Sequence, residues 1–355
     1  MRVPGVRTKT MDARQRETRE QIVSLLRGQV ACPLIASLAE LGIVQGMVSG
    51  SFSPSDFVAV RNQVLLESCF QYLQSLGLLQ GGPGQREYAL TDLGHSVFRR
   101  VGAFFLLSSY REYFDSFSAL LTGGFQGEVC VDRRLNVMGS GSLHTRKFFP
   151  SVAVFFGSNP PDALLDLGCG DGAFLEFARR EWSELRIAAV DLSPVAIQAT
   201  VNRLKNIGAE PEVTIVENAA FVDSWVALMP LTMREAHCLL ISMWFVVHEF
   251  SEGESGKLVQ FFRRVRQCLP QAEIILGEIV KIPSDVLAED YEVSILPEFL
   301  LFHELSGQGV FSWSEWLSVL SQIPYQLSSE RLFDLIHDAT GDPVASSFVW
   351  HLKPT

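Results

Sequence analysis

The fold is decided by residues 165–172, which read LDLGCGDG. They follow an apolar segment with the pattern of a strand and precede residues 174–180, which have the pattern of a helix. Glycines at a strand-to-helix turn let the backbone bend sharply and let a ligand approach where side chains would collide. The stretch therefore predicts a cofactor-binding turn at the carboxyl end of a strand.

Strands and helices alternate from residue 162 onward, which predicts an α/β fold with a Rossmann-like, doubly wound sheet. Helices are expected at 174–180, 195–206 and 256–268. The expected strands are 163–167, 185–190, 213–216, 238–245, 273–276 and a final antiparallel strand at 346–352. Apolar strands separated by helices make a parallel sheet whose crevice lies at the carboxyl ends of the strands.

Two acids accompany the glycine-rich turn. Asp166 stands two residues before the first glycine, and Asp191 ends the next expected strand. A carboxylate at the second position can accept hydrogen bonds from both hydroxyls of a ribose. A nicotinamide-binding turn more often has a glycine at the third spacing, where this chain has Ala173 and Phe174.

The N-terminal half has the pattern of a winged helix. An amphipathic helix from Asp12 carries Ile22, Leu25 and Leu26 on one face, and apolar helices are expected at 31–41 and 56–76. A strand, a tight turn and a second strand follow at 78–91. We expect three regions, namely a dimerisation domain at 1–102, connecting helices at 103–157 that roof the active site, and a cofactor-binding domain at 158–355.

Composition restricts the partners and the compartment. The 355 residues carry a net charge of −11, and residues 12–100 hold eight acids and eight bases. Because nucleic-acid binding needs a basic surface, a DNA-binding role for the winged half is disfavoured. No apolar run reaches about 18 residues, so no membrane span is expected. The six cysteines form no CxxC pair and indicate reduced thiols in a cytoplasmic protein.

The glycine-rich turn resembles that of class I S-adenosylmethionine-dependent methyltransferases. By this resemblance Asp166 and Gly168 face the methionine end of the cofactor, and Asp191 faces its ribose. Many family members have Asp beside the adenine where this chain has Asn218, which is a departure from the pattern. The cofactor contacts that the resemblance implies are Asp166, Gly168, Gly170, Asp191, Leu192, Asn218 and Ala219.

Two His-acid pairs narrow the resemblance. His248-Glu249 ends the fourth strand, where small-molecule O-methyltransferases have a His-acid step whose His is the general base. His303-Glu304 is a second pair. With Gly277-Glu278 and the winged N-terminal half, these pairs resemble the metal-dependent C-methyltransferases of α-keto acids.

The narrower resemblance implies a metal site and a reaction. The expected catalytic residues and metal ligands are His248, Glu249 and His303, around one divalent or ferric ion such as iron or zinc. Glu278 and Glu304 are expected in support. A metal chelated by a 2-oxo acid acidifies the C3 protons and so prepares C3 for methylation. The resemblance reads closest to the 2-ketoarginine enzymes, with phenylpyruvate or another 2-oxo acid as the alternative substrate.

The sequence leaves other substrates and functions open. A guanidinium substrate would need an acidic partner, for which Glu112, Asp115 and Glu298 are candidates. A metal-free O-methyltransferase would use His248 as its base. A winged-helix regulator that only senses S-adenosylmethionine is the non-enzymatic alternative. The apolar surface of the N-terminal helices predicts a homodimer.

Overall fold

The computed structural model describes residues 13–82, 87–124, 131–157, 159–283, 286, 296–337 and 343–355. Cys130, the N-terminal tail and part of the expected turn at 81–84 lie outside these residues. The chain divides into two compact units, Met1–Ser108 and Ser109–Thr355. The boundary between the units lies between residues 108 and 109, whereas the sequence predicts it after residue 102.

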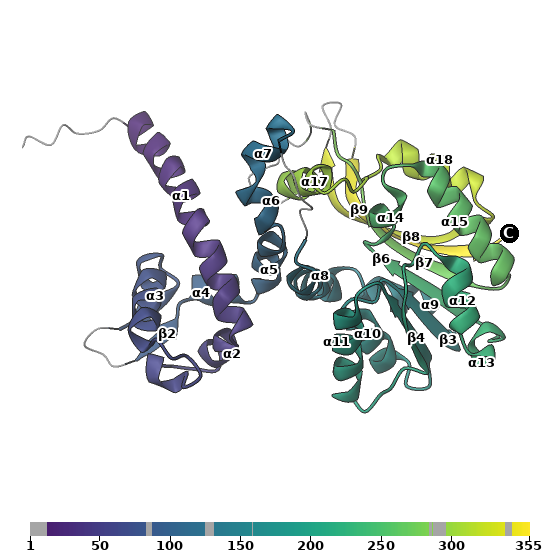
Figure 1. The fold of residues 1–355 in the computed structure, drawn as a ribbon, viewed down its shortest axis with the longest axis horizontal. Coiled ribbons are helices and arrows are strands. Elements are labelled where there is room, and N and C mark those ends of the chain that lie inside the picture. The colour runs from purple at the N-terminus through teal and green to yellow at the C-terminus, as the bar shows by residue number, and fades with distance from the viewer. Residues whose placement is uncertain are drawn as a thin grey trace, which may run out of the picture. The chain divides into compact units, whose positions relative to one another are not determined.

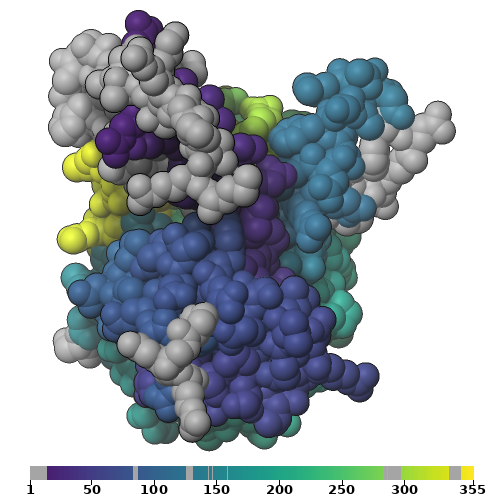
Figure 2. All heavy atoms as spheres, turned by 90° about the vertical axis from the view of Figure 1, so that its left-hand side faces the viewer, coloured from purple at the N-terminus to yellow at the C-terminus, as the bar shows by residue number. Residues whose placement is uncertain are grey.

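The first unit is mostly helical and contains a small hairpin (Figure 1). Helix α1 is one continuous helix, although separate helices were expected from residue 12 and at 31–41, and Pro33 lies inside it. Figure 2 shows α1 in purple rising from the blue body of this unit. The elements are α1 (Ala13–Glu40), α2 (Ile43–Val48), η1 (Pro54–Asp56), α3 (Gln63–Ser75), β1 (Leu79–Gly81), β2 (Tyr88–Leu90), α4 (Asp92–Phe98) and α5 (Val101–Ser109).

The helix expected at 56–76 is two elements. Ser53 and Asp56 form a capping box around the short helix η1. Helix α3 then begins at Gln63, because the Asn62 side chain accepts a hydrogen bond from the Leu65 amide at 3.0 Å. The hairpin expected after it is present as an antiparallel β1–β2 pair.

One helix of the described residues, Arg14–Glu40, is long and apolar enough to cross a membrane by these two criteria alone. This is weak evidence, because core helices and signal sequences can have the same length and composition.

The second unit is built on a seven-stranded sheet in the order β5-β4-β3-β6-β7-β9-β8 (Figure 1). The first five strands in this order are parallel, and β9 is antiparallel to both of its neighbours, β7 and β8. This confirms the Rossmann-like α/β fold. The strands are β3 (Ala163–Leu167), β4 (Arg186–Asp191), β5 (Val213–Val216), β6 (Leu239–Trp244), β7 (Glu273–Ile279), β8 (Tyr325–His337) and β9 (Pro343–Pro354).

Apolar side chains cover both faces of this sheet. One core contains Trp225, Phe262 and Trp316, and the other contains Phe149 and Phe174, all of them buried. The helices of this unit are α6 (Arg111–Asp115), α7 (Phe117–Thr122), α8 (Arg133–Lys147), α9 (Pro150–Phe156), α10 (Ala173–Glu181), α11 (Pro194–Lys205), α12 (Val222–Leu228), α13 (Leu231–Arg234), α14 (Val247–Ser251), α15 (Ser255–Cys268), α17 (Leu296–Leu305) and α18 (Trp313–Gln322).

Candidate active site

The glycine-rich turn has the backbone that its sequence predicts. Gly168, Gly170 and Gly172 have φ angles of 72°, 56° and 77°. A Cβ on Gly168 would lie 2.7 Å from the Val246 side chain, and one on Gly172 would lie 2.9 Å from Thr200. Glycine is therefore required at both positions by conformation and by space.

Asp191 ties the end of β4 to this turn. Its Oδ2 accepts a hydrogen bond from the Gly170 amide at 3.0 Å, and its Oδ1 accepts one from the Ser193 amide at 2.8 Å. Burial raises the pKa of Asp191, although both amide hydrogen bonds act to lower it. Each carboxylate oxygen keeps a further lone pair for a ligand hydroxyl.

A cavity of about 640 Å³ lies at this edge of the sheet. It brings together six of the seven residues expected at the cofactor: Gly168, Gly170, Asp191, Leu192, Asn218 and Ala219. Helix α8, from the segment expected to roof the site, lines the cavity with Arg133, Asn136, Val137 and Ser140.

Asp166, the seventh residue, lies outside the cavity lining. Its side chain is buried and accepts a hydrogen bond from the Ser242 hydroxyl at 2.5 Å. Burial raises its pKa to about 7, with the Ser242 hydrogen bond acting in the opposite direction. Asp166 therefore links β3 to β6 through this hydrogen bond.

The residue that departs from the family pattern, Asn218, shapes the turn after β5. Its Oδ1 accepts a hydrogen bond from the Ala220 amide at 2.8 Å. A carboxylate could accept the same bond, so the amide preserves the local backbone while removing a charge from the cavity.

The two predicted histidines face one another. The Nε2 atoms of His248 and His303 lie 3.1 Å apart, and both side chains are buried. His248 comes from α14 and His303 from α17, 55 residues later. The sequence therefore singled out two imidazoles that the fold brings into contact.

The other nitrogen of each ring is held by an acceptor. His248 Nδ1 lies 2.9 Å from Glu278 Oε2, and His303 Nδ1 lies 2.6 Å from the carbonyl of Phe299. The Glu278 carboxylate also accepts hydrogen bonds from the amides of Val247 and Ile279. Because carbonyl and carboxylate oxygens accept, both Nδ1 atoms carry hydrogen and both Nε2 atoms of the neutral rings carry lone pairs.

Two lone pairs that face each other at 3.1 Å repel, so this arrangement needs positive charge between the rings. A proton on His248 is one source. Burial lowers the pKa of His248, but the Glu278 carboxylate outweighs burial, so the pKa lies above its ordinary value. Burial and the charge on His248 hold the pKa of His303 below its ordinary value. A metal ion is the other source.

The third expected ligand, Glu249, forms an ion pair in this structure. Its Oε1 accepts a hydrogen bond from Arg133 Nη1 at 2.7 Å, and Glu249 lines the cavity of about 640 Å³. Glu304 is exposed and pairs with Lys281 at 3.2 Å. No cluster of three or more His, Cys, Asp or Glu side chains suited to a metal occurs among the residues that the structure describes.

Sequence reasoning missed three features of this site. Arg133 pairs with Glu249, and His144 stacks on Phe245 with ring centroids 4.1 Å apart. Phe245 has a φ of 53°, which is strained for an aromatic residue. A signal was present for α8, because its sequence RRLNVMGSGSLHTRK has basic residues and no acid in a chain with a net charge of −11.

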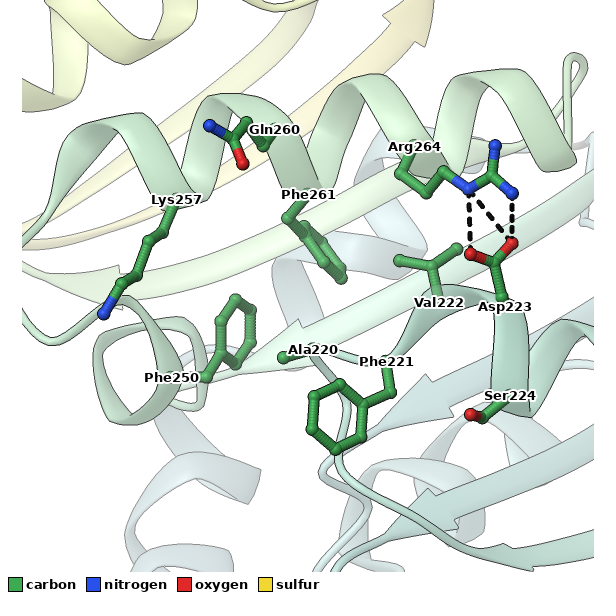
Figure 3. A pocket seen from close by; sticks show the side chains of 10 residues that line it. All are labelled: Ala220, Phe221, Val222, Asp223, Ser224, Phe250, Lys257, Gln260, Phe261 and Arg264. Carbon is green, nitrogen blue, oxygen red and sulfur yellow. Dashed lines mark hydrogen bonds and ion pairs between the residues drawn. The ribbon is translucent and has the colours of Figure 1, made fainter.

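A second hollow of about 480 Å³ adjoins the cofactor cavity and shares Ala220, Phe221, Phe250 and Lys257 with it. Figure 3 shows Phe221 and Phe250 on either side of Ala220, below Phe261 of α15. The bidentate pair of Arg264 with Asp223 lies at its edge. This hollow extends the apolar surface beyond the turn that follows β5.

Comparison with known proteins agrees with this geometry. A family model described as a methyltransferase domain matches residues 143–291. The matched residues contain the glycine-rich turn and strands β3 to β7, and the fold is that of the class I methyltransferases.

Individual relatives are distant. Trans-aconitate 2-methyltransferase of Mycobacterium sp. (strain KMS) is 27% identical over 158 residues, which cover 40% of this chain and 61% of that protein. The chain thus spans less than two thirds of the curated relatives it matches.

Two solved structures share the fold across nearly the whole chain. The mitomycin 7-O-methyltransferase MmcR has 15% identity and a TM-score of 0.61, over 97% of this chain and 99% of that one. Human N-acetylserotonin methyltransferase, solved with S-adenosylmethionine, has 17% identity and a TM-score of 0.56, over 98% and 99%.

Proposed function

We propose that this protein transfers the methyl group of S-adenosylmethionine to C3 of a 2-oxo acid, with a transition-metal ion held by His248 and His303. The observation that carries the proposal is the pair of facing Nε2 atoms, each with its Nδ1 bound to an acceptor. This is the tautomer in which imidazole binds a metal, and acceptors on the other nitrogen are typical of metal-binding histidines.

The distance between the two Nε2 atoms also fits a shared ion. Imidazole nitrogens bind transition-metal ions at about 2.0–2.1 Å, so His248 and His303 could hold one ion together. The observed separation is 3.1 Å. A bound ion would act as a Lewis acid that draws electrons from the keto oxygen of the substrate.

The chain itself supplies orientation and charge. Glu278 and the Phe299 carbonyl fix the two rings, and Glu249 in the adjoining cavity is the candidate acceptor of the C3 proton. The C3 carbanion equivalent then attacks the methyl group, the sulfur–methyl bond breaks, and S-adenosylhomocysteine leaves. Arg133, which lines this cavity, favours an anionic acceptor. The name of the mycobacterial relative also specifies an acid, trans-aconitate.

The three acids expected as candidates for binding a guanidinium group do not favour such a substrate. Glu112, Asp115 and Glu298 are exposed, and Asp115 lies 3.7 Å from Arg111. Charged groups in water bind a cation weakly.

Aromatic rings instead lie at His303 and at its sequence neighbour Phe302. Phe302 stacks on Tyr110 with centroids 4.7 Å apart and lies 5.2 Å from Phe114. The ring of Phe299 lies 4.1 Å from that of His303. This wall favours an aryl 2-oxo acid such as phenylpyruvate over 2-ketoarginine.

O-methylation is the second candidate, and the His248–Glu278 contact favours it. A histidine oriented by a carboxylate at 2.9 Å can remove a proton from a hydroxyl group. The structurally similar MmcR is named as an O-methyltransferase. In this reading His303 accepts a hydrogen bond from protonated His248, and no metal is needed.

Metal content and turnover of His303→Ala separate the two candidates, with His95→Ala in the first unit as the control. We expect wild type and His95→Ala to carry about one transition-metal ion per chain, and His303→Ala to lose both the ion and turnover. Near-normal methyl transfer by His303→Ala in the presence of a chelator would contradict the metal site and favour O-methylation.

We also propose that the protein is a homodimer formed through α1. Ile22, Leu25, Leu26 and Val30 share one face of this helix and are 52%, 78%, 66% and 54% exposed. An apolar stripe of this kind is typical of an interface with a partner of the same chain.

A further inference from the structure

Helix α8 carries one more titratable side chain, His144, in contact with a residue that lines the cavity. Arg133, Val137 and Ser140 line the cofactor cavity from this helix. His144 follows Ser140 by four residues and so lies on the same face, one turn further along. Its ring stacks on Phe245, which lines the cavity from the end of β6.

Two aromatic contacts hold His144 against Phe245. The ring of His144 lies 4.1 Å from that of Phe245 at an angle of 19°, and Phe148, which follows the last residue of α8, packs on the ring of Phe245 at 5.0 Å. Phe245 is held at a φ of 53°, three residues before His248. Strained backbone persists where surrounding contacts enforce it, and it concentrates at functional sites.

The imidazole of His144 has hydrogen-bonding capacity that the described residues leave unused. The side chain is half-buried, and no described residue forms a hydrogen bond to either of its ring nitrogens. Burial, Lys147 and His248 hold the pKa of His144 well below its ordinary value. The ring is therefore neutral near pH 7 and offers one N–H donor and one lone pair.

We infer that His144 is a substrate-orienting residue, which hydrogen-bonds an oxygen of the methyl acceptor beside Phe245 and His248. The inference rests on the proposed function for the identity of that acceptor, an aryl 2-oxo acid. Both kinds of oxygen in such an acid accept hydrogen bonds, and the carboxylate accepts the stronger ones. The stack on Phe245 sets the orientation of the donor, and the acceptor is thereby aligned with the methyl group.

Two variants separate hydrogen bonding from packing. His144→Phe keeps a ring on Phe245 and removes both nitrogens, whereas His144→Gln keeps a donor and an acceptor and removes the ring. We expect His144→Phe to raise the KM for phenylpyruvate at least tenfold while the Kd for S-adenosylmethionine changes less than twofold. His144→Gln should regain part of the loss. A KM for phenylpyruvate in His144→Phe within twofold of wild type, or equal losses in both variants with lowered thermal stability, would overturn the inference.

Binding measured without turnover keeps this test separate from the reaction. Calorimetry of phenylpyruvate against protein saturated with S-adenosylhomocysteine gives the Kd of the acceptor directly. If wild type binds no 2-oxo acid, the proposed function fails. If wild type binds it and His144→Phe binds it equally well, the assignment of His144 is wrong and the proposed function stands.

Discussion

Removing the carboxylate of Asp191 should weaken cofactor binding by a predictable amount. Its two oxygens already hold the amides of Gly170 and Ser193 at 3.0 and 2.8 Å, so the ligand hydroxyls use the remaining lone pairs. Charge-assisted hydrogen bonds contribute about 1.5–3 kcal/mol each in full burial, and Asp191 is only half-buried. We expect Asp191→Ala to cost about 1–3 kcal/mol, a rise of about 5-fold to 150-fold in the Kd of S-adenosylmethionine.

Isothermal calorimetry measures this Kd, and two further variants sharpen the result. Asp191→Asn keeps one acceptor oxygen and should lose less than Asp191→Ala. Asp223→Ala removes an exposed carboxylate that pairs with Arg264 in the same unit, so it controls for the change in net charge. A Kd for Asp191→Ala within twofold of wild type would show that the ribose assignment is wrong.

Three other predictions follow from the same structure. Gly168→Ala should abolish cofactor binding, because the added Cβ would lie 2.7 Å from the Val246 side chain. Gly208 has a similar φ but open space around it, so the control Gly208→Ala should lose only about 1–2 kcal/mol of stability in thermal melting. Asp166 has a folded pKa of about 7, above its unfolded value, so the stability that its protonated form contributes is lost as the pH rises through 7. The Tm of the wild-type apo-protein should therefore fall between pH 5 and 8, and that of Asp166→Asn should fall less. An equal fall in both proteins would refute the raised pKa. Leu25→Glu places a charge on the apolar face of α1 and should give a monomer by light scattering; a monomeric wild type would contradict the dimer.

The sequence predicts the parallel sheet well, because its strands are short apolar segments bounded by clear turns. It predicts the C-terminal hairpin less well. Strand β8 (Tyr325–His337) lies at the sheet edge, mixes polar and apolar residues without regular alternation, and was not expected. Strand β9 is longer than the expected 346–352. The continuous α1 was also missed, because the Pro33 that suggests a break is accommodated inside the helix.

The residues of the candidate site also differ in how well the sequence predicts them. Local backbone requirements mark the glycine-rich turn, and the family resemblance marks the two His-acid pairs, so both are recognised in the sequence. Contacts between side chains distant in sequence cannot be predicted in this way, and the pair of Glu249 with Arg133, 116 residues away, is an example. The stack of His144 on Phe245 likewise depends on how α8 packs against β6.

The position of the transferred methyl group tests the central claim most directly. Wild type is incubated with phenylpyruvate and S-adenosylmethionine labelled with carbon-13 in its methyl group, and the product is followed by NMR. The account predicts a carbon-bound methyl signal coupled to the single proton left on C3. A methoxy signal, from the enol oxygen or from an ester of the carboxylate, would contradict C-methylation.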